Sequence, residues 1–212
     1  MGPSAFSGFV GEPAEIGPSA LDLSRPRWWQ TGAMHEQDDR LHAVLSESQR
    51  VGFLGDRPID EVIDHARAFV AALEGVTGRI VDLGSGGGVP GLVIAADRPD
   101  LSIVLVDRRA KRTDFLERVV RRCGWHDRID VVHADVTHLS GTDAAGFDAV
   151  VARGFGPPAV TAEMGAALIN ATGRIVISEP PDGDRWTDVE ARYALVRRQH
   201  HDRRVVVFER ST

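Results

Sequence analysis

Residues 80–91 read IVDLGSGGGVPG, and residues 103–107 read IVLVD. The first stretch is an apolar strand that runs into a glycine-rich turn, and a helical pattern follows the turn. The second stretch is another apolar strand, which ends in the carboxylate of Asp107. This succession of strand, glycine-rich turn, helix and strand with a terminal carboxylate is the arrangement that holds a nucleoside in α/β folds.

The spacing of the glycines favours S-adenosylmethionine (SAM) over a nicotinamide dinucleotide. The pattern Asp-x-Gly-x-Gly-x-Gly runs from Asp82 to Gly88, whereas a dinucleotide-binding oxidoreductase is expected to show Gly-x-Gly-x-x-Gly. The chain after Asp107 is also too short for the separate substrate domain of such an oxidoreductase. These residues therefore predict a SAM-dependent methyltransferase.

Each part of the predicted cofactor site has a physical role. Gly84 and Gly86 allow a sharp turn with no side chain in the way. Asp82 is placed for the methionine ammonium of SAM, Asp107 for the ribose hydroxyls, and Asp135 for the adenine amino group. The residues predicted to bind SAM are Asp82, Gly84, Ser85, Gly86, Gly88, Asp107, Arg108, Asp135, Val136 and Arg153.

Hydrophobic periodicity predicts strands alternating with helices from Arg79 onward. Two β-rich runs between Tyr193 and Glu209 suggest an antiparallel hairpin that closes the sheet edge. We therefore expect an α/β, Rossmann-like class I methyltransferase fold with a seven-stranded, mostly parallel sheet and helices on both faces. The predicted strands are 79–84, 102–107, 129–134, 147–152, 173–178 and 203–209, and the predicted helices are 36–49, 58–73, 88–97, 110–123 and 157–169.

The expected domain organisation has three parts. Residues 1–30 are rich in Gly, Pro, Ser and Ala and are expected to form a flexible leader. Residues 31–76 form a small N-terminal helical extension, and residues 77–212 form the methyltransferase domain. Trp28 and Trp29 are expected either to anchor the leader to the protein body or to form an aromatic lid over a substrate.

Composition indicates the cellular compartment and the kinds of partner that we expect. The chain has a formal net charge of −6 and one cysteine, Cys123, so that no internal disulfide is possible. We expect a cytoplasmic protein with no secretory signal, no membrane span and no metal site. The acidic total argues against broad affinity for nucleic acid. A local run of cations nevertheless suggests an RNA-facing stripe or a solvated helix exterior; it comprises Arg108, Arg109, Lys111, Arg112, Arg118, Arg121 and Arg122.

From Arg79 to Thr212 the chain resembles the bacterial small-subunit rRNA guanine-N7 methyltransferases, also called glucose-inhibited division protein B. The segments that carry the resemblance are 82–92, 98–101, 105–107, 111–116, 131–134, 147–153 and 173–175, and the Pro90-Gly91 pair is more distinctive than the glycines. The resemblance implies a class I fold, SAM as methyl donor and methyl transfer to a nitrogen. It also implies that Arg153 faces the acceptor pocket, and it makes 16S rRNA or the small ribosomal subunit a candidate partner.

The chain departs from this family on the acceptor side. The family usually has Lys-Gly after the fifth strand, where this chain has Ser178-Glu179-Pro180-Pro181, and a glutamate there would repel a phosphate. Upstream, His65 resembles the histidine of a family Arg-His pair. These departures favour a small-molecule acceptor, a nitrogen or an oxygen, and a 16S rRNA guanine-N7 methyltransferase is the alternative. A third hypothesis is that the protein binds SAM without catalysing methyl transfer.

The candidate catalytic residues are Arg153, Glu179 and His65. A hydroxyl or amine acceptor needs a base, for which Glu179 and His65 are the candidates, whereas guanine N7 has a lone pair and no proton to lose. Each residue also has a structural interpretation: Arg153 as an ion-pair partner, Glu179 as the start of a Pro-rich loop, and His65 as a polar residue on a helix face.

Overall fold

The computed structural model describes residues 33–139, 146–179, 186, 195–198 and 204–210. Trp28 and Trp29 lie outside these residues, so their role stays a prediction. The helices are α1 (Ala33–Arg50), α2 (Ile59–Ala72), α3 (Gly91–Asp97), α4 (Ala110–Arg122) and α5 (Pro158–Leu168), with a short 3-10 helix η2 (Val136–His138). The strands are β1 (Gly78–Leu83), β2 (Leu101–Asp107), β3 (Ile129–His133), β4 (Phe147–Ala152), β5 (Ile169–Ser178), β6 (Leu195–Arg198) and β7 (Val205–Arg210).

The strands form one sheet in the order β3-β2-β1-β4-β5-β7-β6. The pairs from β3 to β5 are parallel, and β7 runs antiparallel to both β5 and β6. The predicted α/β class and mostly parallel sheet are therefore confirmed, together with the hairpin at its edge. The strand order reverses between β1 and β4, and open α/β sheets bind ligands outside the carboxyl ends of their strands at such a reversal.

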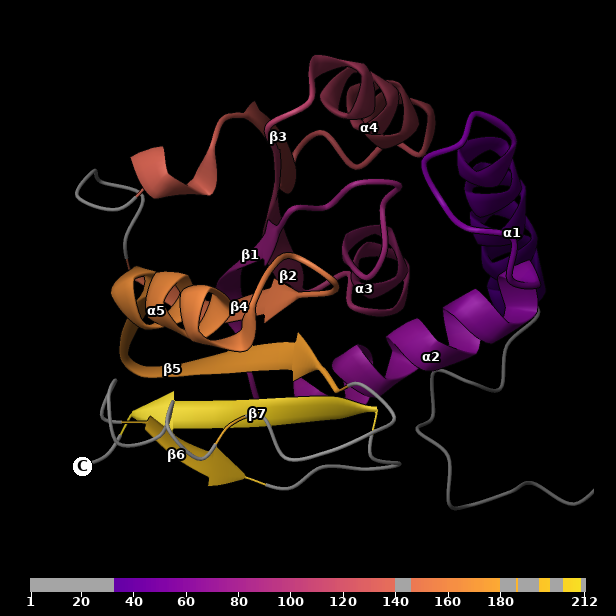
Figure 1. Ribbon diagram of the computed structural model, residues 1–212. Coiled ribbons are helices and arrows are strands. Elements are labelled where there is room, and N and C mark those ends of the chain that lie inside the picture. Colours follow the sequence, from indigo (N-terminus) through magenta and orange to yellow (C-terminus); the bar gives the residue numbers. More distant parts are fainter. Residues whose placement is uncertain (1–32, 140–145, 180–185, 187–194, 199–203, 211–212) are drawn as a thin grey trace, which may run out of the picture. The chain divides into compact units, whose positions relative to one another are not determined.

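Helices cover both faces of the sheet (Figure 1). On one face, α1 to α4 pack into a single apolar cluster in which Phe69 and Phe115 are fully buried. On the other face, α5 covers a second cluster that includes Phe147 and Phe208. The placement of α3 and α4 opposite α5 follows from the strand order, because a right-handed crossover places its helix on one face before the reversal and on the other face after it.

An apolar stripe along α2 is buried against the core. Ile59, Val62, Ile63, Ala66 and Phe69 recur at the i, i+3, i+4 spacing, and all five are buried. Most predicted helix and strand boundaries shift by only one to three residues. In the residues that the structure describes, no helix is both long and apolar enough to cross a membrane.

The largest difference from the expected elements is at the start of β5. The strand begins at Ile169, which pairs with Phe147, and the register then shifts so that Ala149 pairs with Arg174. Asn170 lies in the shifted part, where its amide donates to Asp148 Oδ1 at 2.9 Å and its Oδ1 accepts from the Thr172 N–H at 3.0 Å. These local bonds interrupt the apolar pattern, so periodicity alone detects only the second part of the strand.

Candidate active site

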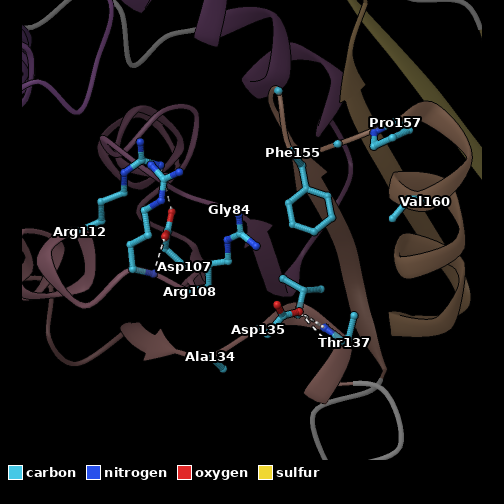
Figure 2. A pocket seen from close by; sticks show the side chains of 14 residues that line it. Gly84, Asp107, Arg108, Arg112, Ala134, Asp135, Thr137, Phe155, Pro157 and Val160 are labelled. Carbon is cyan, nitrogen blue, oxygen red and sulfur yellow. Dashed lines mark hydrogen bonds and ion pairs between the residues drawn. The ribbon is translucent and has the colours of Figure 1, made fainter.

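A cavity of about 370 Å³ lies at the carboxyl ends of β1 to β4. Figure 2 shows Asp107, Arg108 and Arg112 on one side of it and Phe155, Pro157 and Val160 on the other. Its volume falls in the range of small-molecule and cofactor pockets. The lining residues are Gly84, Asp107, Arg108, Arg109, Arg112, Ala134, Asp135, Val136, Thr137, Gly154, Phe155, Gly156, Pro157 and Val160. Five of the predicted cofactor residues are in this set, namely Gly84, Asp107, Arg108, Asp135 and Val136.

Asp107 links the second strand to the glycine-rich loop. Its Oδ2 accepts from the Gly86 N–H at 2.9 Å, and its Oδ1 accepts from the Arg109 N–H at 2.9 Å. Nη1 of Arg112 lies 3.5 Å from the same Oδ2. Each carboxylate oxygen has two lone pairs, so Asp107 keeps the capacity to accept ribose hydroxyls while it holds the loop in place.

Asp135 follows β3 and is the N-cap of η2. Its Oδ1 accepts from the Thr137 N–H at 3.0 Å and from the Thr137 hydroxyl at 2.8 Å. The backbone N–H and the hydroxyl of Thr137 lower the pKa of Asp135, so this carboxylate is ionised at neutral pH. Its second oxygen remains able to accept from an amino group in the cavity.

The glycine-rich loop needs glycine for two separate reasons. Gly84, Gly86 and Gly88 have φ values of +69°, +55° and +97°, in the left-handed region that side chains disfavour. Gly84 is also covered by an aromatic ring, because a methyl group there would lie 2.8 Å from Phe155 Cδ2. The loop can therefore take no side chain at Gly84 without displacing Phe155 from the cavity wall.

The region before α2 supports the same loop from outside the cavity. Ser48, near the end of α1, is fully buried and donates its hydroxyl to the Gly87 carbonyl at 2.9 Å. Leu54 also packs against Gly87, where a methyl group would lie 2.7 Å from its side chain. The N-terminal helices thus help to position the loop that the sequence predicts to bind SAM.

Asp82 lies at the strand-order reversal and has an incomplete set of partners. The residue is 1% exposed, and its Oδ2 accepts from the Gly91 N–H at 3.1 Å. Its Oδ1 is buried and, among the described residues, has no hydrogen-bond partner. Burial raises the pKa of Asp82 to about 7, against the opposing effect of its hydrogen bonds and of Arg153. A buried acceptor of this kind fits a cationic donor.

Arg153 follows β4, and its positive charge acts to lower the pKa of both Asp82 and His65. Its Nη1 is buried without a hydrogen-bond partner in the described part of the chain. Burial, followed by the charge of Arg153, lowers the pKa of His65, so the imidazole is neutral at neutral pH. The structure therefore brings Asp82, Arg153 and His65 into one electrostatic group, although none of them lines the cavity.

Glu179 has a structural contact that the sequence did not suggest. Both of its carboxylate oxygens accept from the indole N–H of Trp186, at 3.0 and 3.1 Å. Trp186 is 1% exposed and packs edge-on against Phe208 with ring centroids 5.3 Å apart. The Glu179 N–H donates to the Arg204 carbonyl at 2.7 Å. The carboxylate thus secures the chain after β5, and it is not part of the cavity wall.

Several cavity residues, Arg112 and Phe155 among them, were not predicted as site residues. Arg112 enters the wall from the first turn of α4, and Phe155 enters it from the loop after β4. Phe155 has a local signal, because an aromatic residue between Gly154 and Gly156 directly after a strand is an unusual place for a core side chain. Arg112 has no such signal in the sequence, because its contact with Asp107 depends on how α4 packs on the sheet.

Solved structures with a similar fold include several methyltransferases. One from Geobacter sulfurreducens gives a TM-score of 0.61 at 13% identity, over 86% of this chain and 97% of that chain. A second structure is a T. thermophilus 16S rRNA N2 G1207 methyltransferase in complex with AdoMet and guanosine. Its TM-score is 0.56 at 20% identity, over 74% of this chain and 44% of that chain. These likenesses establish the fold. The fold, the cavity and the sequence relatives together define the class, a SAM-dependent methyltransferase.

The family follows from the sequence. Residues 41–185 match the family model GidB, described as rRNA small subunit methyltransferase G. The chain belongs to this family. The match begins in α1 and extends past β5, so it covers the glycine-rich loop and the segments after β4 and β5.

Several relatives carry the name ribosomal RNA small subunit methyltransferase G. That of Mycolicibacterium paratuberculosis is 33% identical over 197 residues, which are 85% of this chain and 77% of the relative. That of Salinispora arenicola is 31% identical over 173 residues, 75% of this chain and 72% of the relative. That of Frankia casuarinae is 37% identical over 147 residues, which are 68% of this chain and 53% of the relative. The predicted resemblance is confirmed, and the small-molecule acceptor that the sequence favoured is not supported.

Proposed function

We propose that the protein transfers a methyl group from SAM to guanine N7 of 16S rRNA in the small ribosomal subunit. The observation that carries this proposal is the extent of the family match, which spans the acceptor side as well as the cofactor side. The departure at Glu179 is compatible with it, because that carboxylate binds the Trp186 indole and lies outside the cavity wall.

The residues at the carboxyl edge fit SAM. Asp82 Oδ1 is a buried acceptor without a partner in the described residues, which suits the methionine ammonium. Asp107 and Asp135 retain acceptor capacity for the ribose hydroxyls and the adenine amino group. Arg108 and Val136 complete the wall around the nucleoside. When bound, SAM supplies an electrophilic methyl group on a sulfonium.

The protein's own part in the reaction is to position the acceptor. Guanine N7 has a free lone pair, so no residue has to remove a proton before the attack, and orientation supplies most of the rate. Arg153 keeps a donor with no partner in the described residues, beside Asp82, and we propose that it orients the acceptor guanine. Phe155 lies over Gly84 in the cavity wall, where its ring covers the cofactor loop. His65 and Glu179 are not needed as bases for this acceptor.

The test uses purified protein and SAM labelled in the methyl group. One reaction receives small ribosomal subunits that lack the modification, and the other receives a small-molecule extract of cells. We expect label in 16S rRNA, released as 7-methylguanosine after digestion to nucleosides. Label only in the small-molecule extract would overturn the proposed acceptor and keep the methyltransferase class, whereas another methylated nucleoside in the RNA would overturn the proposed N7 position alone.

A further inference from the structure

Charge is distributed unevenly along this acidic chain. Residues 108–122, which comprise α4 and the two residues before it, contain seven basic and two acidic residues in a chain of net charge −6. Phe115, Leu116 and Val119 bury the apolar side of α4 against the sheet, so its charged residues face outward. A local net charge of +5 on one exposed helix marks a surface suited to a polyanion.

The basic side chains of this segment fall into two groups. Arg121 pairs with Glu117 at 3.4 Å, Arg122 with Glu47 at 2.9 Å and Arg112 with Asp107 at 3.5 Å. The others are exposed and, among the described residues, have no carboxylate oxygen within 4 Å. We call them the α4 cation row, and they are Arg108, Arg109, Lys111 and Arg118.

The row begins at the cavity. Arg108 and Arg109 line the cavity wall, and Lys111 follows in the first turn of α4 (Figure 2 shows the Arg108 side chain beside Asp107). Lys111 and Arg118 are seven residues apart, so they share one face of the helix about 10 Å apart along its axis. Asp114 lies between them on that face, so the row presents spaced cations rather than one continuous basic patch.

We propose that the α4 cation row binds the phosphate backbone of the RNA next to the methylated guanine. This inference rests on the proposed function and adds to it the surface that holds the RNA. An RNA strand bound along the row would run outward from the cavity wall along α4, and cations about 10 Å apart would reach different phosphates. Unpaired arginine and lysine side chains suit this role, because they need not leave a carboxylate partner to bind a phosphate.

The experiment compares two double variants of the full-length protein. The test variant is Lys111→Gln/Arg118→Gln, which removes two members of the row that lie outside the cavity wall. The control is Arg121→Gln/Arg122→Gln, which removes the same charge from the same helix but at residues paired with Glu117 and Glu47. Binding to a fluorescein-labelled, unstructured uridine oligonucleotide is measured by anisotropy over a range of salt concentrations, and SAM affinity is measured by calorimetry.

We expect the test variant to bind the RNA more weakly, with the slope of log affinity against log salt reduced by about 0.7 per substituted residue, the value for single strands. The control should keep a slope close to that of the unmodified protein, and both variants should keep its SAM affinity. Equal slopes for the two variants would overturn the row as an RNA surface. Failure of the wild-type protein to methylate 16S rRNA would overturn the proposed function instead. The two outcomes are distinct, because the first is a comparison of RNA binding between variants and the second is an activity of the wild-type protein.

Discussion

At the scale of single residues, Asp82 is the group whose charge the fold controls most strongly. Burial raises its pKa to about 7, so the carboxyl of the free protein is about half ionised at neutral pH. The same carboxyl has one oxygen without a partner in the described residues. A cationic ligand at that oxygen would favour the ionised form, which links cofactor binding to release of a proton.

We predict that SAM affinity rises by about fivefold from pH 6 to pH 7, because the ionised fraction of Asp82 rises by that factor around a pKa near 7. Asp82→Asn should bind more weakly and show a flatter pH dependence. Calorimetric titrations across this range test the prediction. An affinity of the unmodified protein that does not change with pH would contradict the placement of the ammonium at Asp82.

The free protein should show the opposite dependence in its stability. The folded-state pKa of Asp82 lies above the ordinary value of an aspartate, 3.8, so its contribution to the free energy of unfolding is present below about pH 4 and is lost as the pH rises to about 7. Asp82→Asn should remove this part of the pH dependence of the free energy of unfolding. Denaturant titrations of the free protein at pH 5 and pH 7.5 give the comparison, and an unchanged difference between the two values in the variant would contradict it.

Glu179 gives a prediction that separates its catalytic and structural interpretations. Glu179→Gln keeps an amide oxygen that can accept the Trp186 N–H, so turnover and stability should stay close to the wild-type values. Glu179→Ala removes that acceptor and should lower the free energy of unfolding by about 1–2 kcal/mol. Single-turnover rates and denaturant titrations of both variants test this. A large loss of turnover in Glu179→Gln, with stability unchanged, would favour the base interpretation.

At the scale of elements, the glycine-rich loop combines backbone conformation with a close contact. Gly84 and Gly124 both have φ of +69°, but a methyl group at Gly84 meets Phe155 at 2.8 Å, whereas one at Gly124 meets nothing within 4 Å. We predict that Gly84→Ala and Gly124→Ala share a backbone cost of about 1–2 kcal/mol in stability. Gly84→Ala alone should weaken SAM binding, because Phe155 must move in the cavity wall.

The matched φ values make this comparison direct. Thermal unfolding gives the stability of each variant, and calorimetry gives its SAM affinity. A weakening of SAM binding by the same factor in both variants would mean that the contact with Phe155 has no role at the site.

At the scale of the whole molecule, a charged cluster joins three helices on one face of the sheet. Arg67 of α2 donates its Nε–H to Asp97 Oδ2 at 3.0 Å and pairs with Asp38 of α1 at 2.5 Å. Asp97 is the last residue of α3, and its side chain is 4% exposed. Burial raises the pKa of Asp97, against the hydrogen bond and charge of Arg67. Arg67 therefore stabilises the ionised form of Asp97 against the effect of burial.

We predict that Arg67→Ala lowers the free energy of unfolding by roughly 2–3 kcal/mol, because Asp97 would be left buried without this partner. Arg40→Ala is the control, since the Arg40–Glu36 pair is exposed and should contribute less than about 1 kcal/mol. The deficit of Arg67→Ala should shrink in acid, because the folded-state pKa of Asp97 is raised and protonation removes the buried charge. Urea titrations at pH 5 and pH 8 check both statements, and a deficit that grows in acid would contradict the second.

The sequence by itself determined the class of this protein. Residues 80–91 and Asp107 predict the cofactor loop, the alternating periods predict the sheet, and the family motifs predict the relatives that the comparisons show. These features can be predicted from sequence because each depends on neighbouring residues. A turn with positive φ requires glycine, and a strand that is buried on both faces requires a run of apolar residues.

Only the tertiary structure decided which side chains meet. It joined Glu179 to Trp186, placed Arg112 beside Asp107 and Phe155 over Gly84, and divided the cations of α4 into paired and unpaired groups. The physical reason is that such contacts depend on how helices pack against the sheet, and residue spacing along the chain does not encode that packing. The same packing buried Asp82, so its raised pKa is a property of the fold and not of the motif that contains it.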